Sequence, residues 1–274
     1  MALQHVIGLD HVVVAVRDLD AAAAAWQAVG FTLSPRGTHS AHMGSGNYTI
    51  MLGEDYIELL GVLAPTEHNA PMRTFLQERE GLDRAAFTTD DAKAGVAELR
   101  AKGIEAIGPV SFGRPVSMPG GGQAEARFEV FRWPAEMRPG GLGIFACQHL
   151  TRQNVWIPAL QGHANAATRL IRIEVLTPEP EAAARELAGL LDREPTQQTD
   201  GAWRVPSGAG RADFDFLHRD TLARRHGDLA ASAPLSEGAV ALVLGTSDLS
   251  AARQVLGGRD AAWVTGVLLR FEAV

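Results

Sequence analysis

The stretch that decides the fold is Gly8-Leu9-Asp10-His11-Val12-Val13-Val14-Ala15-Val16, an apolar strand with one histidine near its start. Its opening recurs as Gly81-Leu82-Asp83-Arg84, 73 residues further along the chain. At the same spacing Asp18 corresponds to Asp91, and each aspartate stands where the N-cap of a following helix belongs. A strand and a helix start that recur in the same order indicate a duplicated supersecondary unit.

Working outward from this stretch, each copy is predicted to fold as β-α-β-β-β. In the first copy, residues 1–62, we predict a helix over 21–29 and strands over 9–16, 31–34, 48–52 and 56–62. The second copy, residues 81–152, has a predicted helix over 92–102 and strands over 84–89, 105–107, 126–133 and 143–150. Between its middle strands, Pro119-Gly120-Gly121-Gly122 is too rich in glycine for regular structure and is predicted as a loop.

Residues 168–274 repeat the same plan twice more in a weaker form, and the last copy has a predicted helix over 249–256 that starts at Asp248 and a predicted strand over 267–273. Arg172 lies near the position of His11, and Ala241 or Gly238 takes that position in the last copy. The predicted fold class is therefore α+β, with about four tandem βαβββ modules in two pairs. We expect two domains. Residues 1–152 would carry the site, and residues 168–274 would form a degenerate pair that supports it or mediates dimerisation.

Composition limits the classes of function. The chain has 274 residues, enough for one large or two ordinary domains, and its net charge of −7 argues against binding to nucleic acid or an anionic membrane. A single cysteine, Cys147, cannot form an internal disulfide and is typical of a reducing compartment. There is no apolar run of membrane-spanning length and no signal-peptide pattern. We expect a cytoplasmic protein that binds a small-molecule substrate.

Three residues in the first pair of modules are candidate metal ligands. Besides His11, Glu58 lies in the apolar strand Tyr56-Ile57-Glu58-Leu59-Leu60, where a carboxylate is costly unless it is paired or bound to a cation. His149 lies in the last strand of the second unit. Imidazole and carboxylate together accept several divalent transition metals. Taken singly, His11 is more typical of a solvated or hydrogen-bonded strand end than of a ligand. Glu58 is equally typical of a partner for an arginine such as Arg84, and His149 of a strand cap.

Other polar residues carry weaker signals. His39, His42 and Asn47 lie near the second strand, where they either line a cup or form a polar surface turn. Glu129 alternates with apolar neighbours, which fits an outward-facing residue as well as a general base. Cys147 lies two residues before His149, but its apolar neighbours indicate a buried structural thiol rather than a nucleophile.

The first 60 or so residues resemble the vicinal oxygen chelate superfamily, and more narrowly its bacterial glyoxalase-like domain branch. The resemblance is carried by Gly-Leu-Asp-His, the alanine-rich helix after Asp18, Gly-Asn-Tyr and Tyr-Ile-Glu-Leu-Leu-Gly, and by Cys147-Gln148-His149-Leu150-Thr151. It implies that paired modules curl into a cup, with metal ligands on their first and last strands. Carried over to this sequence, those ligands are His11, Glu58 and His149. The fourth place holds Arg84, which cannot ligate a cation but suits a substrate oxyanion.

The resemblance implies a lyase, isomerase or dioxygenase that uses a divalent ion, Zn, Fe, Mn, Ni or Co, to chelate a small oxygenated metabolite. Glu58 and Arg84 would be catalytic, and His42, Asn47 and Arg84 would bind substrate. The alternative is a metal-free protein that sequesters a drug or another small molecule, with Trp26, Trp133 or Trp156 stacking on the ligand. A homodimer is compatible with either reading.

Overall fold

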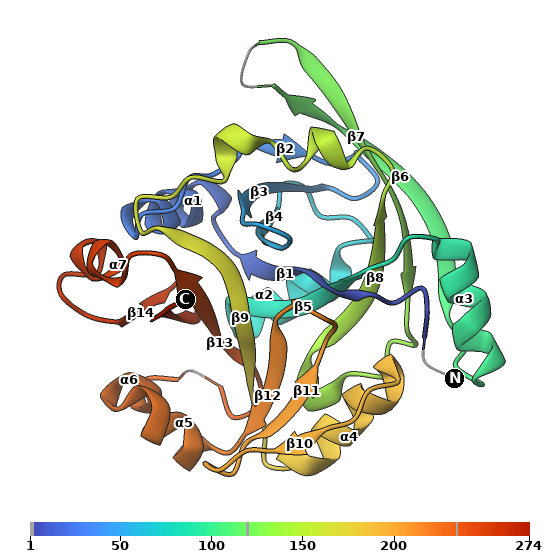
Figure 1. Ribbon diagram of the computed structural model, residues 1–274. Helices are drawn as coiled ribbons and strands as arrows, with labels where there is room; N and C mark the ends of the chain where they lie inside the picture. Colours follow the sequence, from blue (N-terminus) through green and yellow to red (C-terminus); the bar gives the residue numbers. More distant parts are fainter. Residues whose placement is uncertain (1–2, 119–120, 234) are drawn as a thin grey trace.

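The computed structural model describes residues 3–118, 121–233 and 235–274, and these form two curved sheets with helices around them (Figure 1). The first sheet, in the described residues, has eight strands in the order β2-β3-β4-β1-β5-β8-β7-β6. Its strands are β1 (Gly8–Val16), β2 (Gly37–Thr38), β3 (Ser45–Met51), β4 (Tyr56–Val62), β5 (Gly81–Thr88), β6 (Ile107–Ser117), β7 (Gln123–Arg132) and β8 (Gly143–His149).

The second sheet, counted over the same described ranges, has seven strands in the order β10-β11-β12-β9-β13-β15-β14. They are β9 (Ala167–Leu176), β10 (Thr196–Gln197), β11 (Trp203–Pro206), β12 (Asp213–Leu217), β13 (Gly238–Thr246), β14 (Ala261–Val264) and β15 (Val267–Ala273). The helices are α1 (Leu19–Ala28), α2 (Ala70–Glu78), α3 (Ala92–Ala101), α4 (Pro180–Leu191), α5 (Arg219–His226), α6 (Asp228–Ala231) and α7 (Leu249–Val255), with short 3₁₀ turns η1 (Pro139–Gly141), η2 (Arg152–Asn154) and η3 (Pro158–Leu160). None of the helices described is long and apolar enough to cross a membrane.

The predicted α+β modules are confirmed. In the first sheet β1 pairs in parallel with β4, β5 pairs in parallel with β8, and β1 and β5 join the two units by antiparallel pairing. The second sheet repeats this plan with β9 and β13 at its centre. Asp18, Asp91 and Asp248 each accept two amide hydrogen bonds at the start of a helix, as the repeated N-cap signal predicts.

The first sheet curls until β2 lies against β6, so that one of its faces becomes an interior. One face of β1, with Leu9, Val12 and Val14, belongs to a large apolar cluster that also contains Ile173 and Leu242 of the second sheet. The opposite face carries His11. At one end of the interior, α2 packs Met72 and Leu76 against Ala15. At the other end, the η2–η3 segment packs Trp156 against Tyr56.

Two predictions of secondary structure were wrong, and two helices were missed. Residues 31–34 are not a strand, because Phe31 enters the core and the segment makes only one backbone contact to β3, from Ser34 N to Thr49 O. The predicted short strand at 105–107 is instead the long β6, whose prolines are tolerated because it is an edge strand. Helices α5 and α6 were not predicted. Of the predicted loop 119–122, residues 119 and 120 lie outside the described residues.

Candidate metal and substrate site

His11 is held at the centre of the first sheet by the residue before it. Its Nδ1 lies 2.6 Å from Asp10 Oδ1, and the exposed fraction of the two residues is 3% and 0%. Neighbouring strand residues normally point to opposite faces, but the β1–β5 pairing shifts register between Leu9 and His11, which lets both side chains meet. Because Nδ1 is bonded to the Asp10 carboxylate, the imidazole directs Nε2 to the interior. A carboxylate bonded to one ring nitrogen in this way orients a histidine to bind a metal through the other nitrogen.

Glu58 lies opposite that Nε2. The distance from His11 Nε2 to Glu58 Oε2 is 3.8 Å, and Asn47 Nδ2 donates to Glu58 Oε1 at 2.6 Å. Donor atoms that each lie about 2.1 Å from an ion are at most about 4.2 Å apart, so the His11–Glu58 pair can share one. The structure therefore brings together His11, Glu58 and Asn47, which come from β1, β4 and β3.

His149 contacts this pair through Asp10. Its Nε2 lies 2.9 Å from Asp10 Oδ1, and its Nδ1 is buried without a hydrogen-bond partner in the described chain. Thr88 Oγ1 donates to the other oxygen of Asp10 at 3.0 Å. Burial alone would raise the pKa of Asp10, but the two imidazoles outweigh it and hold that pKa well below its usual value. Asp10 is thus an ionised carboxylate shared by two histidines.

The strand register shows what stands at the four places related by the repeat. In β1, Val13 pairs with Glu58, and its counterpart in β5, Ala86, pairs with Phe145. The places of His11 and Glu58 are therefore taken by Arg84 and Phe145 in the second unit. His149 lies four residues beyond Phe145 on the same strand. His149 as a metal ligand stays a prediction, since its Nε2 contacts Asp10.

Arg84 is engaged by its own neighbour in the same way as His11. Its Nε donates to Asp83 Oδ2 at 2.7 Å, and Arg138 Nη2 lies 3.7 Å from the other oxygen of that carboxylate. Asp83 corresponds to Asp10 in the repeat. The Asp-His pair of the first unit is thus matched by an Asp-Arg pair in the second, which gives the interior one ligand-bearing side and one cationic side.

Aromatic and apolar side chains surround the histidines. The Tyr56 ring stacks on His11 at 4.3 Å between centroids, and Phe145 meets the same imidazole edge-on at 5.4 Å. Cys147 Sγ lies 3.7 Å from His149 Nε2. Burial, together with the charges of Asp10 and Glu58, raises the pKa of the Cys147 thiol well above its usual value. The thiol is therefore protonated, as expected for a structural cysteine rather than a nucleophile.

A second set of potential ligands overlaps this one. The donor atoms of Asp10, Cys147 and His149 all lie within 4.8 Å of one another, the one such set found in the described ranges. Sulfur, nitrogen and oxygen donors of this kind suit zinc. In the arrangement present, however, Asp10 already accepts from both histidines. The His11–Glu58 pair fits an ion better, because His11 Nε2 and Glu58 Oε2 face each other. The other ring nitrogen of His11 is bonded to Asp10, and the other oxygen of Glu58 is bonded to Asn47.

The other predicted binding residues lie further out. His42 is exposed in the turn before β3, with its ring 5.1 Å from that of His68. Trp26, on α1, and Trp133, just after β7, are buried in the cluster between the sheets rather than in the interior. Trp156 does cover the interior, where its ring lies 4.8 Å from that of His149.

Two polar residues of the site were missed from the sequence. Asp10 had a signal, since an aspartate in an apolar strand is as costly as Glu58, and it recurs as Asp83. Arg114, on β6, is 8% exposed and its side chain makes no hydrogen bond or ion pair within the described residues. Its signal was hidden, because β6 was not predicted as a strand and its inward face was not known.

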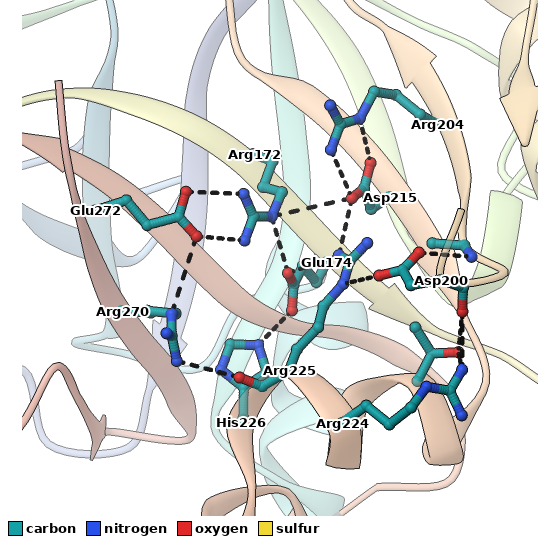
Figure 2. A network of polar contacts seen from close by, with 12 residues as sticks. Arg172, Glu174, Asp200, Arg204, Asp215, Arg224, Arg225, His226, Arg270 and Glu272 are labelled. Carbon is teal, nitrogen blue, oxygen red and sulfur yellow. Dashed lines mark hydrogen bonds and ion pairs between the residues drawn. The ribbon is translucent and has the colours of Figure 1, made fainter. Parts of the chain in front are cut away.

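The second sheet carries charges where the first carries ligands. By the same register, Arg172 and Asp215 stand at the places of His11 and Glu58, and Ala241 stands at that of Arg84. Figure 2 shows the network that fills this face. Glu174 accepts from Arg172 at 2.9 Å, Arg225 at 2.8 Å and His226 at 2.6 Å.

This network is a structural one. Burial would raise the pKa of Glu174, but His226 and the two arginines lower it to about 2. Asp215 accepts from Arg204 at 2.7 and 2.9 Å and from Arg225 at 2.8 Å, so its carboxylate is also satisfied. The cations and carboxylates described on this face therefore bind one another.

The fold and these residues can be compared with known proteins. A family model described as a glyoxalase-like domain matches residues 9–191. No curated protein sequence matches the chain. A hypothetical protein from Staphylococcus aureus superposes with a TM-score of 0.69 at 13% identity, over 97% of this chain and 99% of that one.

Two further solved structures are similar. A xylose isomerase-like TIM barrel/4-hydroxyphenylpyruvate dioxygenase fusion protein has a TM-score of 0.59 at 15% identity, over 95% of this chain and 40% of that one. A mutant of 4-hydroxymandelate synthase from Streptomyces coelicolor has a TM-score of 0.55 at 16% identity, over 94% and 76% of the two chains. At these identities the structural likeness shows a shared fold.

Proposed function

The chain belongs to the glyoxalase-like domain family of the vicinal oxygen chelate superfamily, and on that premise we propose that it is a divalent-metal-dependent enzyme. It acts on a small oxygenated metabolite as a lyase, isomerase or dioxygenase. The observation that carries this proposal is the array Asp10–His11–Glu58–Asn47, in which two ligand atoms lie 3.8 Å apart and each ligand is oriented by a further hydrogen bond.

Each residue has a separate task. His11 and Glu58 hold the ion, and His149 is the third ligand that the resemblance implies, with Nδ1 as the ring nitrogen that Asp10 does not engage. The bound ion supplies Lewis-acid stabilisation of oxyanion charge on a chelated substrate. Asp10 fixes the tautomer of His11, and Asn47 keeps one oxygen of Glu58 turned to the interior. Arg84 and Asn47 orient the substrate, and the aromatic wall of Tyr56 and Phe145 excludes water.

Metal analysis tests the proposal. Protein purified without chelator is expected to carry about one divalent ion per chain, and His11→Ala with Glu58→Ala should remove it. His5→Ala is the matched control, because His5 is also bonded to a carboxylate, Asp90 at 2.7 Å, but on the surface. Full occupancy in the double variant would refute the assignment. Loss of the ion in His5→Ala as well would show that occupancy only reports on folding.

A metal-free binding protein of the same fold is the second candidate. It is favoured by one observation, that Arg84 and Phe145 occupy two of the four places related by the repeat and neither side chain can ligate a cation. In that case the apolar interior holds a ligand against Trp156. Absence of stoichiometric metal from folded wild-type protein, after reconstitution with each of Zn, Fe, Mn, Ni and Co, would support this reading.

A further inference from the structure

The interior of the first sheet is buried near the η2–η3 segment and becomes exposed toward α2. Along the inward face of β7, Phe128 and Val130 belong to the interior apolar cluster, and Arg132, two residues further on, is exposed. Along the inward face of β5, Ala86 is fully buried and the side chain of Arg84 is 31% exposed. Two arginines therefore stand where the inward faces of these strands meet solvent.

The strand register places Arg132 on the same face of the sheet as the candidate metal ligands. His11 pairs with Ala86, Ala86 pairs with Phe145, and Phe145 pairs with Arg132. The Phe145 ring meets the imidazole of His11 at 5.4 Å, which confirms that this row faces inward. Neighbouring strands lie about 4.8 Å apart, so Arg132 is about 14 Å from β1 along the curved sheet. A small ligand that reaches from one to the other passes over Phe145.

Cationic and imidazole side chains from four segments gather at the α2 end. Arg84 and Arg132 come from β5 and β7, and His42 and His68 come from the turn before β3 and the segment before α2. The rings of the two histidines lie 5.1 Å apart. Asp83 accepts from Arg84 Nε at 2.7 Å, whereas Arg132 forms no ion pair with a carboxylate in the part of the chain that the structure describes.

The charges at this end repel one another. Burial, together with the charge of Arg84, lowers the pKa of Arg132 from its usual value. Burial, and then the charges of Arg132, His42 and Arg84, lower the pKa of His68. The chain as a whole has a net charge of −7, so this concentration of cations runs against its overall charge. An anion bound among these groups would relieve the repulsion and accept their hydrogen bonds.

We propose that Arg132, together with Arg84, binds an oxyanion group of the ligand, a carboxylate or a phosphate, at the α2 end of the interior. The guanidinium of Arg132 offers such a group two parallel hydrogen bonds. The ligand is therefore a small organic acid or phosphate ester whose anionic end lies beside the two arginines. That this ligand is the substrate, with its other oxygens directed to His11 and Glu58, rests on the proposed function. The anion site itself does not.

Isothermal titration calorimetry with inorganic phosphate, and separately with acetate, tests the proposal at constant ionic strength, with sodium chloride as the control for unspecific charge effects. Saturable binding of phosphate alone indicates a phosphate ester, and saturable binding of acetate indicates a carboxylic acid. In Arg132→Gln the dissociation constant should rise by about fivefold or more, because a charge-assisted hydrogen-bond donor is lost. Arg127→Gln should bind as wild type, because Arg127 is also exposed on β7 but shares the opposite face with Phe131.

The ring signals of His68 in nuclear magnetic resonance spectra, assigned with His68→Gln, show where the anion binds. The pKa of His68 should rise when the anion binds, and it should also rise in ligand-free Arg132→Gln, because a neighbouring positive charge is removed. Arg132→Gln should keep the thermal midpoint of the wild-type protein, and Arg132→Lys, which keeps the charge, should retain part of the affinity. Equal affinities in Arg132→Gln and Arg127→Gln, no saturable binding of either anion, or an unchanged pKa of His68 on binding would each overturn the proposal.

The same titration with the His11→Ala, Glu58→Ala double variant distinguishes this proposal from the metal assignment, because phosphate and carboxylates also bind divalent ions. The double variant should lose the ion and keep the binding that depends on Arg132. If the wild-type protein carries no metal yet binds an anion through Arg132, the anion site stands and the metal-dependent function fails. If it carries metal and shows no binding that depends on Arg132, the reverse holds.

Discussion

Replacement of Asp10 measures how much the hydrogen bonds of this buried carboxylate contribute to the free energy of unfolding. The carboxylate is fully buried and accepts three hydrogen bonds, from His11 Nδ1, His149 Nε2 and Thr88 Oγ1. Asp10→Asn keeps the shape and one acceptor oxygen but removes the charge. A hydrogen bond to a charged group contributes about 1.5–3 kcal/mol and a neutral one about 0.5–1.5 kcal/mol, so the loss over the two imidazoles is about 2–3 kcal/mol. Asp10→Ala leaves all three donors unsatisfied and should cost about 4–6 kcal/mol.

Urea unfolding of metal-free protein at pH 7 gives these differences, with Thr88→Val as a control that loses one neutral bond and about 1 kcal/mol. The pH dependence provides an independent check. Because the pKa of Asp10 is lowered on folding, its contribution is present above the ordinary aspartate pKa and is lost as the pH falls below it. The gap between wild type and Asp10→Asn should therefore shrink as the pH falls below about 4. A loss under 1 kcal/mol in both Asp10 variants would refute the shared-carboxylate interpretation.

Two further predictions concern charges away from the site. The pKa of Glu174 is lowered to about 2, so the stability that its charge contributes is present above pH 4.5 and is lost as the pH falls from there toward 2. Glu174→Gln should largely abolish this pH-dependent part of the stability. Acid unfolding followed by far-UV circular dichroism measures this; an acid midpoint that does not move would contradict it. Asp55, which accepts from Leu170 N, has its pKa raised by burial to about 7. Its ionisation opposes folding as the pH rises from 3.8 through 7, so Asp55→Asn should stabilise the protein at pH 8 by up to about 4 kcal/mol and have little effect at pH 4. Equal effects at the two pH values would show that the carboxylate is not responsible.

Secondary structure was most predictable where local signals agreed. The strand Tyr56–Val62 and the strand Val267–Ala273 have the bounds expected from their apolar patterns and flanking turns. The helix starts at Asp18, Asp91 and Asp248 follow from side chains that cap their own backbone. The strand β6 was missed because its prolines and glycines are local signals against a strand, and only its edge position in the sheet makes them acceptable.

The sequence by itself determined that the chain is a repeat of βαβββ units, that residues 9–16 form an apolar strand, and that His11 and Glu58 are polar groups in apolar strands that need partners. These properties depend on neighbours within a few residues and on the identity of recurring positions. The partners themselves were decided only by the tertiary structure. A register shift in β1 places Asp10 between His11 and His149, the pairing of β5 with β8 puts Phe145 rather than His149 at the place of Glu58, and the curl of the sheet encloses Arg114 beside Asn47. Each of these contacts joins strands far apart in the chain, and a register that differs by one residue would reverse the face of every side chain involved.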